Sequence, residues 1–208
     1  MKLLAAIQAG GRSRRMGQDK AWLDIKGRPM IEHVLTAAQP LAQRIAIVIS
    51  QPTPEPNRYA ALAAKWQADL LIDAYDHCGP LGGIVTALRH CKEEESALIL
   101  ACDLPFLTTE FLQLLIPHPS SLIPHPLTIP EDRTGRPQML CGLYDAGCLP
   151  FAEQLLAENK LRVVGLCALV ATQTLRWTDY AHLANAERLL LNCNTPDDFR
   201  TDEKSPTK

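Results

Sequence analysis

Short apolar runs alternate with helical patterns along the first hundred residues, and this alternation constrains the fold more than any other feature. The apolar runs, which read as buried strands, cover residues 2–9, 44–50, 68–73 and 96–103. The helical patterns between and after them cover residues 28–39, 57–67, 80–91 and 108–116. Strands that alternate with helices predict a mostly parallel sheet covered on both faces. The expected fold class is therefore α/β, a three-layer sandwich.

The second half of the chain is less regular. Residues 117–137 are rich in proline, so we expect an irregular excursion there with at most one edge strand. Further elements are expected as strands at 138–145 and 172–179, a helix at 149–159, and a helix start capped by Thr195. The tail, residues 201–208, has no apolar anchor and is expected to be disordered. No repeat or long linker interrupts the chain, which predicts a single domain over residues 1–200.

Composition argues against several classes of protein. The 208 residues carry a net charge of -2, so no overall field draws the protein to nucleic acid or to a membrane surface, and neither partner is expected. No apolar run approaches the roughly 20 residues of a membrane span. The seven cysteines form no C-x-x-C pair, which favours neither a disulfide framework nor a zinc site. A cytoplasmic location is the expectation.

The stretch AGGRSRRMGQDKA, residues 9–21, joins the first strand to the first long helix, where an open α/β sheet usually binds its ligand. Gly10 and Gly11 allow successive backbone N–H groups to point into one concavity and hold a phosphate. The cations that could neutralise a polyphosphate there are Arg12, Arg14, Arg15 and Lys20. The stretch fits neither a Walker A loop nor a dinucleotide fingerprint, so a solvated, charged loop is the alternative.

Two carboxylates come at or near the ends of predicted strands. Asp103 closes the most apolar strand and would lie at the same sheet edge as the glycine loop, where it could bind Mg²⁺ or cap the next turn. Asp73 ends an earlier strand, shortly before Gly82 and Gly83, which allow close approach of a ligand or tight helix packing. The run KEEE, residues 92–95, is interpreted as a solvated turn.

Several stretches, in order and spacing, resemble the molybdenum cofactor guanylyltransferases. They are AGGRSRRMGQDKAWLDIKGRPMIEHV, DAYDHCGPLGGIVTAL, ACDLPFL, RPQMLCGLYDAGCLPFAEQLL and NCNTPDDF. The resemblance covers nearly the whole chain, and the first stretch carries the family signature GGxSxRMGxDK. It implies a Rossmann-like nucleotidyltransferase with a nucleotide half at about residues 1–107 and an acceptor half at about 108–200. The implied activity transfers GMP from GTP to molybdenum-molybdopterin and releases pyrophosphate.

The resemblance also implies roles for residues at matching positions. The catalytic residues would be Arg15, Lys20 and Asp103, and Asp103 would bind the cofactor Mg²⁺. The nucleotide would lie against Ala9, Gly10, Gly11, Lys20, Asp73, Gly82 and Gly83, with Asp73 recognising guanine. The acceptor would meet Lys160, Arg162, Asn192 and Asn194. Molybdenum-insertion proteins and molybdoenzyme chaperones are the further partners that it implies.

The chain departs from the family pattern at a few positions. Gln8 stands where the family commonly has Leu, and Lys160 and Arg162 replace a pair of adjacent arginines. Three alternatives stay open: a cytidylyltransferase acting on molybdopterin or another phosphorylated acceptor, a nucleic-acid-binding module built on GRSRR, and a nucleotide sensor or cofactor chaperone that binds GTP without turnover. Base preference separates the first from a guanylyltransferase, and a steep salt dependence of RNA binding would mark the second.

Overall fold

A computed structural model describes residues 1–9, 19–50, 55–75, 77–117, 126–194 and 198 of the chain. Its centre is a seven-stranded sheet of order β5-β4-β1-β6-β8-β7-β9. The strands are β1 (Lys2–Gln8), β4 (Arg44–Ile49), β5 (Asp69–Ile72), β6 (Glu95–Ala101), β7 (Leu127–Pro130), β8 (Cys141–Tyr144) and β9 (Thr172–Leu175). Within the described residues, β8 is the one strand of this sheet that runs against its neighbours. The predicted mostly parallel sheet is confirmed.

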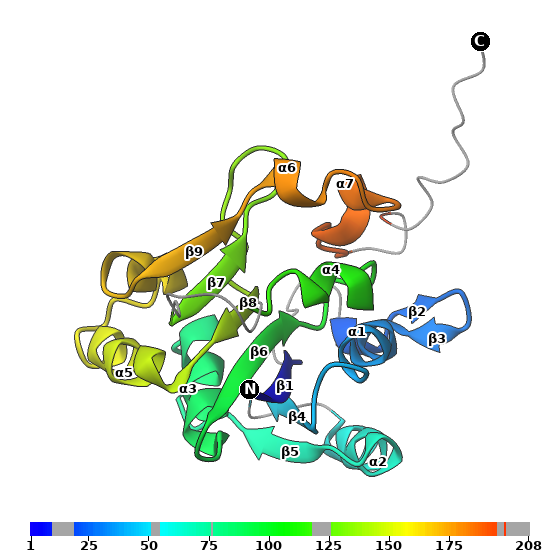
Figure 1. Cartoon of the computed structure of the whole chain (residues 1–208). Coiled ribbons are helices and arrows are strands. Elements are labelled where there is room, and N and C mark those ends of the chain that lie inside the picture. The colour runs from blue at the N-terminus through cyan, green and yellow to red at the C-terminus, as the bar shows by residue number, and fades with distance from the viewer. Residues whose placement is uncertain (10–18, 51–54, 76, 118–125, 195–197, 199–208) are drawn as a thin grey trace.

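Helices cover both faces of the sheet. They are α1 (Met30–Ala38), α2 (Pro56–Trp66), α3 (Pro80–His90), α4 (Thr109–Gln113), α5 (Leu149–Ala157), α6 (Trp177–Tyr180) and α7 (Ala186–Leu189). The shorter elements are the hairpin β2 (Asp24–Ile25) and β3 (Arg28–Pro29), and the 3-10 helices η1 (Lys20–Trp22), η2 (Ala146–Cys148) and η3 (Val163–Ala168). Figure 1 shows α3 and α5 on one face and α1, α2 and α4 on the other. The α/β three-layer sandwich is therefore the observed architecture.

The core follows the alternation of side chains along the strands. In β1, Leu3, Ala5 and Ile7 pack into the cluster beneath α1, α2 and α4. Ala6 points the other way, into the cluster beneath α3 and α5. Because both faces of the parallel strands are covered, nearly every residue of β1, β4 and β6 is buried. This explains why these strands read as continuous apolar runs.

The prediction for the proline-rich segment was wrong in one respect. β7 lies inside residues 117–137, but it is not an edge strand, because it pairs with β8 on one side and with β9 on the other. Its four residues are all buried. Pro130 lies beyond the last β7–β8 pair, Thr128 with Leu143, and its carbonyl accepts a hydrogen bond from the N–H of Gln138. Residues 118–125 of the segment lie outside the described part of the chain.

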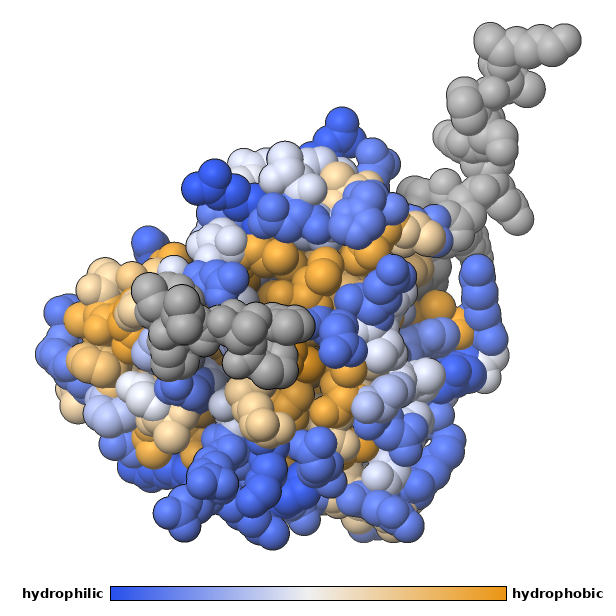
Figure 2. All heavy atoms as spheres, viewed as in Figure 1, coloured by the Kyte–Doolittle hydropathy of each residue, from blue (hydrophilic) through white to orange (hydrophobic). Residues whose placement is uncertain are grey.

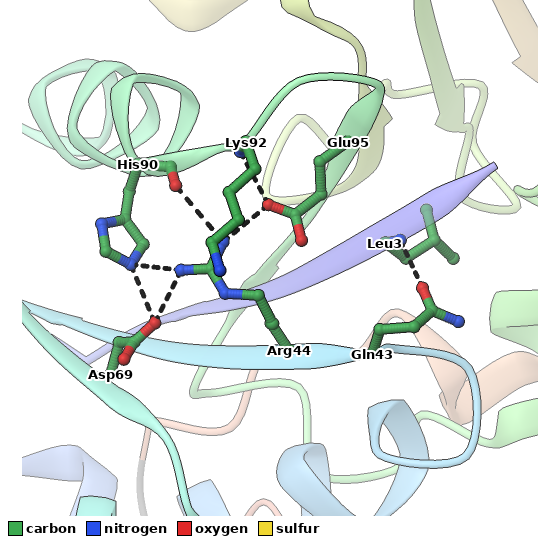
Figure 3. A network of polar contacts seen from close by, with 7 residues as sticks. All are labelled: Leu3, Gln43, Arg44, Asp69, His90, Lys92 and Glu95. Carbon is green, nitrogen blue, oxygen red and sulfur yellow. Dashed lines mark hydrogen bonds and ion pairs between the residues drawn. The ribbon is translucent and has the colours of Figure 1, made fainter.

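The interpretation of residues 92–95 as a solvated turn was also wrong at its last position. Glu95 begins β6, is only 4% exposed and forms an ion pair of 2.7 Å with Arg44 at the start of β4. Figure 3 shows Arg44 reaching Asp69 and His90 as well, at the amino ends of the strands. The local sequence offered no sign of Arg44, which lies 51 residues away. Charges at this end of the sheet join neighbouring strands.

The order of the strands creates a crevice at the other end of the sheet, where the carboxyl ends of the parallel strands lie. From β1 the chain passes to β4 and β5 on one side, and then returns to β6 on the other side of β1. In open α/β sheets, ligands bind at such a switch point, beyond the carboxyl ends of the strands. None of the helices in the described residues is both long and apolar enough to cross a bilayer.

Candidate active site

The carboxyl ends of β1 and β6 bring two predicted site residues side by side. The backbone N–H of Cys102, just after β6, donates to the carbonyl of Gln8 over 3.0 Å. Ala9 and Asp103, the next residues on the two segments, therefore flank the crevice. Both backbone groups of Ala9 are already used, because its N–H donates to Val48 and its carbonyl accepts from Tyr59.

Lys20 joins Asp103 to the C-terminal part of the chain. Its Nζ lies 3.9 Å from Oδ2 of Asp103 and donates a hydrogen bond to Oδ1 of Asn194. The backbone N–H of Cys193 donates to the carbonyl of Asp103 over 2.8 Å. Three segments, far apart in sequence, thus meet around one ammonium and one carboxylate. The structure thus brings together Lys20, Asp103 and Asn194, three of the predicted site residues.

The environment of Asp103 suits a metal ligand. Burial is the largest influence on its carboxyl and raises its pKa, which the charge of Lys20 and a backbone hydrogen bond only partly offset. A partly desolvated carboxylate gains by meeting a cation, and Mg²⁺ commonly uses one or two carboxylates together with substrate phosphates and water. The described residues contain no group of three or more His, Cys, Asp or Glu that could hold a metal ion by themselves. The fit is therefore to a cation shared with a phosphorylated ligand.

Tyr59 of α2 contacts Ala9 and Asp19, the residues on either side of the segment 10–18, and the sequence did not predict this role. Its hydroxyl lies 3.0 Å from the carbonyl of Ala9 and 2.5 Å from Oδ2 of Asp19. The pKa of Tyr59 is raised well above its ordinary value, mainly by burial and next by its hydrogen bond to Asp19. The hydroxyl therefore stays protonated and acts as a hydrogen-bond donor. The other carboxylate oxygen of Asp19 caps η1 by accepting from Ala21. Tyr59 resembles any aromatic core residue in a helical pattern, and that is why the sequence did not single it out.

Asp73 and Gly82 are brought together as a packed pair. The Asp73 carboxylate accepts hydrogen bonds from the N–H of Tyr75 at 2.9 Å and the hydroxyl of Thr86 at 3.3 Å. A Cβ on Gly82 would lie 2.9 Å from both of its carboxylate oxygens and equally close to Tyr75. This close approach of α3 to Asp73 gives Gly82 a packing role in addition to the predicted nucleotide role.

Gly83 has a similar relation to Gln8. A Cβ at Gly83 would lie 2.9 Å from the side-chain amide carbon of Gln8, whose Nε2 donates to the carbonyl of Pro80 over 3.3 Å. The larger, polar Gln8 thus occupies the space that the glycine leaves. Its amide sits over the first turn of α3, beside the crevice.

A cavity of about 410 Å³ opens next to Asp103. Its polar lining includes Asp103, Arg136, Gln138 and Asn192, and its apolar lining includes Met139 and Val163. Figure 2 shows hydrophobic side chains at the centre of the face viewed, with hydrophilic ones around them. The volume and the mixed lining suit part of a small organic molecule.

The four predicted acceptor residues are not placed together. Asn192 lines the cavity and Asn194 contacts Lys20. Lys160 and Arg162 are described by the structure but do not line the cavity; Lys160 pairs with Glu158 at 2.7 Å, and Arg162 precedes η3. Arg136, which does line it, was missed, although it stands in one of the stretches quoted for the resemblance.

Some predictions fall outside the residues that the structure describes. These are the roles of Gly10, Gly11, Arg12, Arg14 and Arg15, the cap at Thr195 and the disordered tail at 201–208. They stay predictions.

Comparison with known proteins identifies the family. The model of the MobA-like NTP transferase domain matches residues 5–174 of this chain. A probable molybdenum cofactor guanylyltransferase of Flavobacterium johnsoniae is 32% identical over 88% of this chain and 90% of its own. Among solved structures, molybdopterin-guanine dinucleotide biosynthesis protein A from Archaeoglobus fulgidus superposes with a TM-score of 0.76, covers 95% of each chain and is 22% identical.

The same fold serves another nucleotide. A 4-diphosphocytidyl-2C-methyl-D-erythritol synthase from Anaerococcus prevotii has a TM-score of 0.65 and 12% identity, and the match covers 96% of this chain and 95% of that one. The fold alone therefore leaves the nucleobase open, whereas the family model and the identity to the Flavobacterium protein identify the family. The chain belongs to the MobA-like NTP transferase family, a family of nucleotidyltransferases.

Proposed function

We propose that this protein transfers GMP from GTP to molybdenum-molybdopterin, which yields the guanine dinucleotide form of the molybdenum cofactor and pyrophosphate. The observation that carries the proposal is the meeting of Lys20 with Asp103 at the switch point of the sheet, in a chain 32% identical to a probable molybdenum cofactor guanylyltransferase. An ammonium and a carboxylate at this place are what a nucleoside triphosphate and its metal ion require.

On the nucleotide side, Lys20 is assigned to the phosphates. Its side chain is 31% exposed, so a ligand can reach it, and hydrogen bonding to Asn194 limits its freedom. Arg15, Gly10 and Gly11 are proposed to complete the phosphate site from the stretch between Ala9 and Asp19. Asp73, Gly82 and Gly83 are proposed for the nucleoside, at the start of α3.

The chemistry needs no activated side-chain nucleophile. An oxygen of the acceptor phosphate attacks the α-phosphorus, a new P–O bond forms, and the bond to the β-phosphate breaks as pyrophosphate leaves with the electron pair. Lys20 and Arg15 stabilise the charge that grows on the phosphoryl and leaving oxygens. Nucleotidyltransferases of this family generally depend on a divalent metal; we propose Mg²⁺, with Asp103 as its protein ligand. When bound, the ion neutralises phosphate charge and orients the leaving group.

On the acceptor side, the cavity beside Asp103 is proposed to receive the pterin. Asn192 lines it, and Asn194 lies where the acceptor and Lys20 would meet. Lys160 and Arg162 stay in the proposal as cations near η3, whose first residue, Val163, lines the cavity.

Three further parts of the proposal concern the setting of the reaction. We propose that the nucleotide half at about 1–107 and the acceptor half at about 108–200 work as one domain. The structure joins no two of the seven cysteines, all of them among the described residues, by a disulfide bond, which supports a reducing compartment, the cytoplasm. Proteins that insert molybdenum, and chaperones of molybdoenzymes, are proposed as partners.

The test is pyrophosphate release by the purified protein with Mg²⁺, molybdenum-molybdopterin and either GTP or CTP. The proposal expects release that depends on both GTP and the pterin. Release with CTP instead would make the protein a cytidylyltransferase, and binding of GTP without release would make it a sensor. Either outcome overturns the proposal.

A further inference from the structure

The cavity beside Asp103 has an unequal distribution of charge. Among the described residues that line it, Asp103 is the one anion and Arg136 is the one cation. The acceptor in the proposed function must bring a phosphate into this space, next to a carboxylate. A phosphate placed there needs a positive partner, and Arg136 is available for it.

The turn that carries Arg136 is built around one carboxylate. Oδ1 of Asp132 accepts from the N–H and the hydroxyl of Thr134, at 2.8 and 2.6 Å, and from the N–H of Arg136 at 3.1 Å. Oδ2 accepts from Nε2 of Gln138 at 2.9 Å. Burial raises the pKa of Asp132, but these hydrogen bonds outweigh it and leave the pKa below its ordinary value. Asp132 therefore stays ionised and holds the turn in one shape.

The same turn is anchored to the rest of the fold on two sides. Glu131 and Pro137 form an antiparallel bridge that closes it. The hydroxyl of Tyr180 donates to the carbonyl of Glu131 over 2.6 Å. The backbone of Arg136 is thus fixed while its side chain remains exposed at the cavity. The guanidinium of Arg136 is therefore positioned at the cavity before a ligand binds.

The chemistry of the side chain indicates which part of the acceptor it meets. A guanidinium forms two parallel hydrogen bonds with a phosphate and is less strongly hydrated than an ammonium. The apolar part of the lining, Met139 and Val163, suits a flat heterocycle rather than a charged group. Lys160, by contrast, is paired with Glu158 and lies outside the lining.

We propose that Arg136 binds the terminal phosphate of the acceptor and that Asp132 positions Arg136 for it; this rests on the proposed function. Arg136 binds two oxygens of the phosphate, and another oxygen of the same phosphate attacks the α-phosphorus of GTP. The assignment adds a residue that the resemblance did not imply, since the acceptor residues implied there include the cations Lys160 and Arg162 but not Arg136.

The test compares Arg136→Met with Arg133→Met, a change of the same kind in the same turn. Arg133 does not line the cavity and pairs at the surface with Glu187 at 2.9 Å. At saturating GTP, Arg136→Met should raise the KM for the pterin at least about tenfold and leave the KM for GTP within twofold, because one charge-assisted phosphate contact is lost. Arg136→Lys should fall between, since charge without the fork recovers part of the contact. Arg133→Met should match the wild type.

Two further measurements separate binding from folding and from failure of the proposed function. Inorganic phosphate should inhibit competitively against the pterin, with an inhibition constant raised at least about tenfold in Arg136→Met and raised less in Asp132→Asn. Equilibrium dialysis of the pterin against the protein without GTP should show the same loss of pterin affinity in Arg136→Met, even if transfer itself is absent. An unchanged pterin affinity in a folded Arg136→Met protein, or a large loss only in Arg162→Met, would overturn the proposal. Absence of GTP-dependent release by the wild type would overturn the proposed function instead.

Discussion

Nζ of Lys20 lies 3.9 Å from Oδ2 of Asp103, although the two residues are 83 positions apart in the sequence. The contact joins the segment after β1 to the segment after β6, on either side of the switch point. In free protein the ion pair lowers the cost of the partly buried carboxylate. The proposed function assigns Lys20 to a phosphate and Asp103 to a metal ion.

The first prediction concerns Lys20→Met. The change keeps most of the unbranched side chain and removes the charge, so kcat should fall about a hundredfold, or roughly 2.7 kcal/mol of transition-state stabilisation. The fold should survive, because the ammonium is part-exposed. Steady-state rates of pyrophosphate release give the measurement. Lys2→Met is the control, since Lys2 pairs with Glu94 at the amino ends of the strands, away from the site. A similar fall in kcat in that variant would contradict a local role for Lys20.

Asp103→Asn should lower activity and raise stability together. The pKa of Asp103 is raised in the folded protein, so ionising it costs folding free energy; that cost is absent below the ordinary pKa and fully present above the raised one. At neutral pH the amide should therefore melt at a higher temperature than the wild type, and the difference should vanish in acid. Turnover should fall at least about a hundredfold with the loss of the proposed metal ligand. Melting curves from pH 3 to 8 test this; equal melting temperatures at pH 7 would contradict it.

Tyr59→Phe should weaken GTP binding through the ends of the glycine-rich stretch. The change leaves the carbonyl of Ala9 and the carboxylate of Asp19 without the hydroxyl donor, which should cost about 1 to 3 kcal/mol of stability. The KM for GTP should rise severalfold and the KM for the pterin should not. Tyr180→Phe is the matched control, because its hydroxyl donates to Glu131, away from the stretch. A rise in the KM for GTP in both variants would show only a general loss of stability.

The two glycines of α3 should respond differently to alanine. In Gly82→Ala the new methyl meets the hydrogen-bonded Asp73 carboxylate and Tyr75, so about 1 to 3 kcal/mol should be lost. In Gly83→Ala it meets the end of the Gln8 side chain, which can turn away, so the loss should stay below about 1 kcal/mol. Gln8→Ala should recover that loss in the double variant. Denaturant unfolding of the wild type, the two glycine variants and the double variant tests this. Equal losses of stability in Gly82→Ala and Gly83→Ala would contradict the packing described.

Local pattern predicted the strands whose own residues are apolar on both faces. β1, β4 and β6 were found because strands covered on both faces carry continuous apolar residues. β7 was misjudged because its inner position comes from pairing with β9, which is more than 40 residues away and leaves no mark on Leu127–Pro130. Glu95 was misjudged for the same reason: its partner Arg44 belongs to another strand.

The site divides in a similar way. Asp103 and Lys20 were predicted because each stands in a recognisable stretch at a strand end, and the fold then brings them together. Tyr59 and Arg136 were missed because their roles depend on what the tertiary structure places beside them. For Tyr59 this is the pair of residues at the ends of one stretch, and for Arg136 it is the cavity.

The most direct test of the account is a single-turnover experiment with GTP labelled at the α-phosphate, molybdenum-molybdopterin and excess enzyme. With wild-type protein the label should move into the pterin product, and with Lys20→Met or Asp103→Asn it should remain in GTP over the same time. Label that stays in GTP with folded wild-type protein, or that moves equally fast in the two variants, would contradict guanylyl transfer at the Lys20–Asp103 site.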